Sequence, residues 1–101
     1  MRDAVNVAIE NAVDALLPLK RAGEKRERPV DLHTRDIVAA AGGPAPFIAW
    51  ASSHPKWRFN VAEAPNELHA KPTALADYVV KSILEELLDR QAAKDAKAGW
   101  K

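Results

Sequence analysis

Histidine, serine and cysteine, the side chains that most often bind metals or attack substrates, are sparse in this chain. There is no cysteine, which excludes thiol nucleophiles and thiolate zinc sites. The three histidines, His33, His54 and His69, are too far apart for the i, i+3 or i, i+4 pairing common in metal sites. No serine lies in a Gly-x-Ser-x-Gly elbow. We therefore expect a protein that is not an enzyme and that holds no metal or other cofactor.

Two further patterns have a simpler structural explanation than a catalytic one. Glu85, Glu86 and Asp89 could act as paired carboxylates, but they alternate with leucines at helical spacing. Such residues are expected on the solvent side of an amphipathic helix. Gly42 and Gly43 lack the Lys-Ser/Thr that follows in a phosphate-binding loop, so they predict the end of a helix.

Phosphate binding is the chemistry that the basic residues could perform. The formal net charge is only +1, but the basic excess lies between residues 18 and 60. A local excess matters more than the sum, because salt screens each charge beyond about 10 Å. The alternative is a solvated loop of mixed charge. The basic residues in question are Lys20, Arg21, Lys25, Arg26, Arg28, Arg35, Lys56 and Arg58.

Length and composition indicate one globular domain. With 101 residues the chain is too short to fill two hydrophobic cores. A hydrophobic content of 48% argues against intrinsic disorder. No apolar run approaches the roughly 18 residues that span a bilayer, and the first residues lack the order of a secretory signal. These features favour a soluble, cytoplasmic module with its domain over residues 1–90 and a flexible or frayed tail over 91–101.

Apolar periodicity predicts four helices. The first covers residues 3–17 and ends near Pro18, or continues for one turn beyond a kink there. A basic linker over about 18–30 follows. Asp31 or Thr34 is the expected N-cap of a short second helix that Gly42 ends. The third helix starts at Pro44 and ends at Ser53, and the fourth covers residues 74–90.

A β-hairpin is expected between the third and fourth helices. Trp57, Phe59 and Val61 alternate with Arg58, Asn60 and Ala62, the period of a strand with one covered face. A turn at residues 64–66 and a return strand at 68–71 complete it. The predicted fold is therefore mainly α with a small hairpin, an α+β domain of order α-α-α-β-β-α. Trp50, Trp57 and Phe59 are expected in its core, with an exposed stacking platform for nucleic acid as the alternative.

This order and the segment from Thr34 to Ile48 resemble a winged helix-turn-helix domain. In the bacterial helix-turn-helix pattern a small residue, a glycine at the turn and a branched apolar residue stand where this chain has Val38, Gly42 and Ile48. Val38 is bulkier than the usual residue. The segment from Phe47 to Phe59 is also similar to the second half of LOTUS-type winged helices, which bind RNA or protein partners.

The resemblance implies a small DNA-binding accessory or transcriptional regulatory protein. The expected DNA contacts are Arg35, Ser52, Ser53, His54, Lys56 and Arg58, with Lys20, Arg21, Lys25, Arg26 and Arg28 on the phosphate backbone. The third helix carries no charged residue, which favours an alternative: a protein–protein adaptor that docks a partner on Pro44–Ser53. A homodimer through helices 3–17 and 74–90 is expected because both offer wide apolar faces.

Overall fold

The computed structural model describes residues 3–98, with side chains through Lys94, and these residues form helices and no strand. The prediction of an α+β fold with a hairpin wing is therefore wrong. In chain order the elements are α1 (Ala4–Arg21), α2 (Glu27–Ala41), α3 (Pro44–Ser53), α4 (Arg58–Ala62), the 3-10 helix η1 (Asn66–Ala70) and α5 (Pro72–Ala98).

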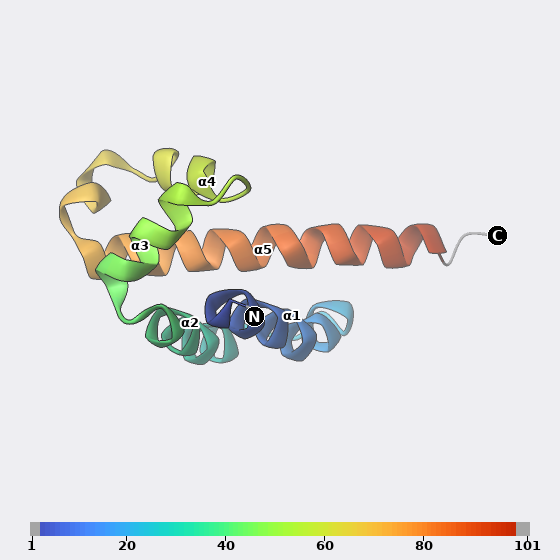
Figure 1. Ribbon diagram of the computed structural model, residues 1–101. Helices are drawn as coiled ribbons and strands as arrows, with labels where there is room; N and C mark the ends of the chain where they lie inside the picture. Colours follow the sequence, from blue (N-terminus) through green and yellow to red (C-terminus); the bar gives the residue numbers. More distant parts are fainter. Residues whose placement is uncertain (1–2, 99–101) are drawn as a thin grey trace.

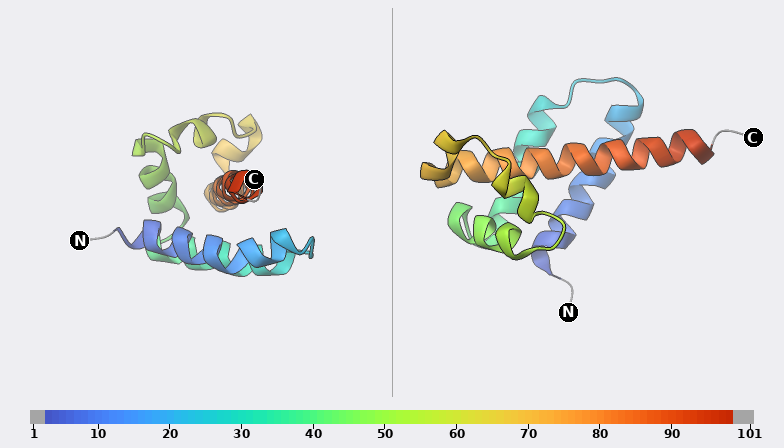
Figure 2. Two further views of the ribbon diagram at one scale, coloured as in Figure 1. Left: turned by 90° about the vertical axis from the view of Figure 1, so that its right-hand side faces the viewer. Right: turned by 90° about the horizontal axis from the view of Figure 1, so that it is seen from above.

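Helix α5 is the central element around which the others pack (Figure 1). Helices α1 and α2 form an antiparallel pair on one side, and α3 and α4 curve around the other side (Figure 2). The buried residues of α5 recur at three- and four-residue steps, as helical packing requires. They are Leu75, Ala76, Val79, Val80, Ile83, Leu84 and Leu88. Beyond them α5 extends past α1 and α2 as far as Ala98, and residues 99–101 of the predicted tail lie outside the described residues.

Helix α1 has the face that its sequence predicts. Val5, Ile9, Ala12 and Leu16 are buried, and Asp3 caps the helix by accepting a hydrogen bond from the Val5 amide at 2.8 Å. The helix continues through Pro18 to Arg21, the second of the two endings considered above. The apolar faces of α1 and α5 pack within one chain. The argument for a dimer therefore no longer holds, although the dimer itself stays a prediction.

Helix α2 begins earlier than the sequence suggests, at Glu27, with Pro29 in its first turn, where a missing N–H costs little. Neither expected N-cap performs that role. Asp31 forms an ion pair with Lys81 of α5 at 3.0 Å. Thr34 is buried, and its hydroxyl donates to the Val30 carbonyl at 2.7 Å. Most of the expected basic linker is thus helical.

The segment predicted as a hairpin forms α4 and η1 instead. Trp57 and Val61 are four residues apart and both are buried, together with Ala64, whereas Phe59 is 58% exposed. A strand would place Phe59 on the same face as Trp57 and Val61. In a helix Trp57 and Val61, four residues apart, share a face, and Phe59 between them lies on the opposite side. The helical period decides the outcome because it buries Trp57, Val61 and Ala64 against the rest of the core.

The turn between α2 and α3 is the part of the predicted helix-turn-helix that the structure contains. Gly42 ends α2 with φ 102°, and Gly43 follows with φ 129°, conformations that residues with a Cβ rarely adopt. The amide of Gly43 donates to the Val38 carbonyl at 3.0 Å and closes the turn. Phe47, fully buried, and Ile48, partly buried, then fix α3 against the core.

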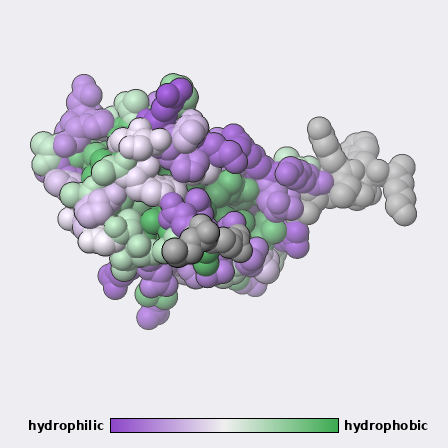
Figure 3. Space-filling model, in the orientation of Figure 1, coloured by the Kyte–Doolittle hydropathy of each residue, from purple (hydrophilic) through white to green (hydrophobic). Residues whose placement is uncertain are grey.

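The surface carries no single large apolar area on the face shown in Figure 3. Hydrophobic side chains appear there as small separate areas among hydrophilic ones. The large hydrophobic residues with the greatest exposure in the described chain are Leu32, Phe59 and Tyr78. On this face, binding through one broad apolar surface is therefore less favoured than binding through polar and charged groups.

Candidate nucleic-acid interface

Helix α3 presents a smooth, uncharged face to solvent. Its inner side is held by Phe47 and Ala51, both fully buried. Every exposed side chain of the helix is small or cyclic and none is charged, so another molecule can approach the α3 backbone closely. The exposed residues are Ala45, Pro46, Ala49, Ser52 and Ser53.

A chain of aromatic rings holds the C-terminal half of α3 in place. The ring centroids of Phe47 and Trp50 are 5.8 Å apart, those of Trp50 and His54 are 5.0 Å apart, and those of His54 and Trp57 are 6.0 Å apart. Such separations are typical of favourable aromatic pairs. The indole N–H of Trp50 donates to the Asp3 carboxylate at 2.6 Å. The rings thus connect α3 to the start of α1 and to α4.

Three exposed basic side chains that form no ion pair with any described residue lie near the two ends of α3. Arg35 of α2 lines a small groove together with Pro44, the first residue of α3. Lys56 and Arg58 follow the last turn of α3, and both are exposed. Within the described part of the chain none of the three forms an ion pair, whereas Lys20 pairs with Asp89 and Arg90 with Glu86.

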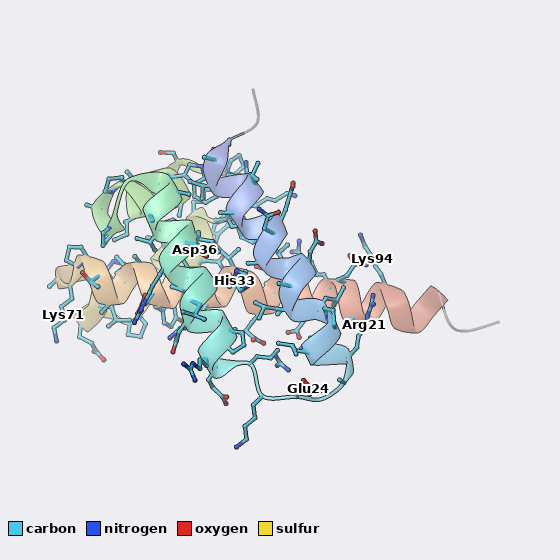
Figure 4. The ribbon with its side chains drawn as sticks, turned by 90° about the horizontal axis from the view of Figure 1, so that it is seen from below. Arg21, Glu24, His33, Asp36, Lys71 and Lys94 are labelled. Carbon is cyan, nitrogen blue, oxygen red and sulfur yellow. The ribbon has the colours of Figure 1, made fainter. Side chains whose placement is uncertain are left out.

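The other basic residues lie at the opposite end of α2. Lys20 and Arg21 are in the last turn of α1, Lys25 and Arg26 are in the connection, and Arg28 is in the first turn of α2. Figure 4 shows Glu24 of this connection at one end of α2 and Asp36 toward the other, nearer α3. Helix α2 has 15 residues, a length of about 22 Å. The structure therefore separates the predicted basic residues into two groups and places only Arg35, Lys56 and Arg58 beside α3.

Phe59 lines a groove that none of the sequence patterns above predicts. The Arg58 guanidinium carbon lies 4.9 Å from the centre of the Phe59 ring. Next to Phe59 a groove of about 640 Å³ runs between α4 and α5. The Asn60 side-chain amide donates to the Ser82 hydroxyl there at 2.8 Å. Lys56 and Arg90 line the same groove together with Glu63, Glu86 and Asp89, and these three carboxylates oppose phosphate binding there. A helical period over Trp57–Val61 predicts that Phe59 is exposed, as the structure has it.

The remaining candidates for chemistry are dispersed. His33 lies on α2 and points toward α1 (Figure 4), and the His69 ring nitrogen Nε2 lies 3.2 Å from the Ala64 carbonyl. Among the described residues no group of three or more histidine and acidic side chains is placed to hold a metal. Of the three α5 carboxylates considered for catalysis, Glu86 and Asp89 are in ion pairs and Glu85 is exposed.

The link between Asp3 and Trp50 predicts an acid-sensitive contact. The indole hydrogen bond, and then the Val5 amide, hold the pKa of Asp3 below its ordinary value of 3.8. Because the pKa of Asp3 is lower in the folded protein than in the unfolded chain, the contact contributes its full stabilisation when the pH is above the ordinary pKa. This stabilisation is lost as the pH falls through the lowered pKa of the folded state. We expect the NMR resonance of the Trp50 indole N–H to move on acidification through this range. In Asp3→Asn the movement should disappear; an unchanged titration in that variant would assign it to another group.

Comparisons with known proteins provide no information about this interface. The chain matches no family model, no curated protein and no solved structure. Among the described residues no helix is both long and apolar enough to cross a membrane.

Proposed function

We propose that the protein binds DNA through the helix-turn-helix unit formed by α2, the Gly42-Gly43 turn and α3. One observation carries the proposal: basic side chains that form no ion pair with any described residue lie near both ends of a helix whose exposed side chains are small and uncharged. Helix α3 has 10 residues, a length of about 15 Å, and the major groove of B-DNA is about 12 Å wide. In this arrangement Arg35, beside the first residue of α3, and Lys56 with Arg58, just beyond its last turn, would contact phosphates on the two sides of a groove.

The exposed chemistry of α3 predicts that backbone contacts dominate over base recognition. Only the hydroxyls of Ser52 and Ser53 can form hydrogen bonds from this face, and Ala45 and Ala49 offer no more than contact with a thymine methyl group. Arginine and lysine contacts to phosphate give affinity without sequence information. We therefore expect weak sequence preference, in keeping with an accessory DNA-binding role in transcription. All of the proposed phosphate contacts belong to one protein chain, so this mode of DNA binding does not require a dimer.

A protein–protein adaptor remains the second candidate function. It is favoured by the same exposed surface of Pro44–Ser53, which has neither charge nor the long polar side chains of a base-reading helix. A partner protein would cover this face mainly by shape, and the flanking basic residues would contribute little to its affinity.

Substitutions at Ala49, exposed in the middle of α3, separate the two functions. Binding of a labelled mixed-sequence DNA duplex is measured at low salt by fluorescence anisotropy. Ala49→Lys should tighten binding several-fold and Ala49→Glu should weaken it by a similar factor, because the phosphate charge responds to sign.

The matched control is Ala15, an exposed residue on α1, changed to Lys and to Glu. These two variants should differ little from each other because Ala15 lies outside the α3 surface. Equal weakening by Ala49→Lys and Ala49→Glu would instead indicate that α3 docks by shape, as the adaptor function requires. No binding of duplex by the unmodified protein at low salt would exclude the DNA-binding function.

A further inference from the structure

Phe59 is an exposed aromatic side chain next to residues proposed to contact phosphate. It is 58% exposed, whereas Trp57, two residues before it, is buried. The Arg58 guanidinium carbon lies over its ring, 4.9 Å from the ring centre. Much of the Phe59 side chain therefore stays open to solvent although Arg58 lies over the ring. An exposed aromatic ring beside an arginine is the kind of surface on which a flat nucleobase stacks.

Phe59 also lines the groove between α4 and α5. The volume of this groove, about 640 Å³, falls within the range of about 300–1,000 Å³ that is typical of small-ligand sites. Lys56, one of the proposed phosphate contacts, lines the same groove. The groove therefore adjoins the surface on which the DNA backbone is proposed to lie.

The polar groups of the groove suit the edge of a base better than a phosphate. The side-chain amide nitrogen of Asn60 donates to Ser82, and the amide oxygen accepts no hydrogen bond from a described residue. Glu63 is exposed and forms no ion pair with a described residue, whereas the other two carboxylates of the groove are in ion pairs. Such oxygens repel phosphate but accept hydrogen bonds from the amino groups of cytosine, adenine and guanine.

We propose that this groove takes an unpaired base of the DNA bound at α3, stacked on Phe59 with its amino group toward Asn60 and Glu63. The inference rests on the proposed DNA-binding function and names the form of DNA that the site prefers. A base must leave its stack to enter the groove, and this costs least where the base has no pairing partner. DNA with an unpaired base is therefore the expected ligand. Cytosine, which has an amino group, is expected to bind better than thymine, which has none.

The test compares three labelled duplexes of one sequence: fully paired, with one central unpaired cytosine, and with one central unpaired thymine. Anisotropy titrations are made at constant low salt. The unmodified protein should bind the cytosine duplex at least about fivefold more tightly than the paired duplex, which is the lower end of measured base–aromatic stacking effects. The thymine duplex should lie between the two, because its unpaired base stacks but offers no amino group.

Three variants assign the preference to the groove, and circular dichroism establishes that each is folded. Phe59→Leu keeps an apolar side chain without the ring and should abolish the preference for unpaired cytosine over the paired duplex. Tyr78→Leu is the matched control, because Tyr78 is an exposed aromatic residue of α5 that does not line the groove, and it should retain the preference. Glu63→Ala should reduce the ratio of the cytosine to the thymine affinity. The ratio is the measured quantity because removal of a negative charge strengthens binding of every duplex.

A preference for the unpaired cytosine that disappears in Phe59→Leu and persists in Tyr78→Leu supports the proposal. Equal affinity for the paired and unpaired duplexes, or a preference that Phe59→Leu retains, overturns it and leaves the proposed DNA-binding function standing. A ratio of cytosine to thymine affinity that Glu63→Ala leaves unchanged overturns the placement of the amino group at Glu63. Absence of binding to all three duplexes overturns both the inference and the proposed function.

Discussion

Phe47→Ala is expected to lower the free energy of unfolding by about 3–5 kcal/mol. Phe47 is fully buried and fixes α3 to the core. The centroid of its ring lies 5.8 Å from that of the Trp50 ring. Truncation removes buried apolar surface and leaves a cavity that the fixed helices α2, α3 and α5 can fill only in part. A domain of this size has about 5–15 kcal/mol of stability, so the variant should lose a large share of it. Urea unfolding followed by circular dichroism measures the change.

Phe59→Ala is the matched control, because it removes the same side chain from a residue that is 58% exposed. We expect its effect to stay within about 1 kcal/mol, since most of the ring already contacts water. This pair tests the helical form of residues 58–62 directly. In a hairpin both phenylalanines would be core residues and both substitutions would be costly. Comparable large losses at Phe47 and Phe59 would therefore contradict the fold described here.

The double charge reversal Lys56→Glu/Arg58→Glu is expected to weaken duplex binding by about tenfold or more at low salt. These exposed residues lie directly after α3 and lack acidic partners within the described chain. Reversal replaces attraction to phosphate by repulsion at one end of the proposed interface. The slope of the logarithm of the binding constant against the logarithm of salt concentration should decrease in magnitude by about 2, one for each lost phosphate contact.

Lys25→Glu/Arg28→Glu serves as the control with the same change in net charge. Lys25 and Arg28 are equally exposed but lie at the other end of α2 from α3. Affinity and salt slope should change far less than in the first variant. If the two double variants weaken binding equally, the attraction depends on total charge and not on the α3 surface, and the assignment of the interface to α3 fails.

The sequence predicts the parts of this fold in which the apolar residues follow one clear period. Residues 5–16 of α1 and the buried positions of α5 recur at three- and four-residue steps, and no other element explains them. The Gly42 turn is equally predictable, because a left-handed backbone strongly favours glycine. Proline is a weaker signal than expected: α1 continues through Pro18, whose ring faces solvent.

Residues 57–62 illustrate why a short apolar pattern is ambiguous. Trp57, Phe59 and Val61 satisfy the period of a strand, while Trp57, Val61 and Ala64 satisfy the period of a helix. Six residues cannot distinguish these, because both periods bring Trp57 and Val61 to one face. Packing against the core distinguishes the two periods: Trp57 and Val61 are buried, and Phe59 is exposed.

The candidate interface was predictable in part. The sequence identifies Arg35, Ser52, Ser53, His54, Lys56 and Arg58 around α3, and the structure places them at or beside that helix. The sequence does not reveal that Lys20–Arg28 lie at the end of α2 that is remote from α3. Residues that are close in sequence are separated in space when a helix of 15 residues stands between them. The contact between Asp3 and Trp50 joins residues 47 positions apart and has no local signal.

The salt dependence of duplex binding by the unmodified protein tests the DNA-binding assignment most directly. Labelled mixed-sequence duplex is titrated at sodium chloride concentrations between about 25 and 200 mM. Three phosphate contacts, from Arg35, Lys56 and Arg58, predict a slope of about −2.7, at about −0.9 for each contact. Absence of binding at the lowest salt concentration, or a slope near zero, would contradict the proposal that this helix-turn-helix unit binds DNA through its backbone phosphates.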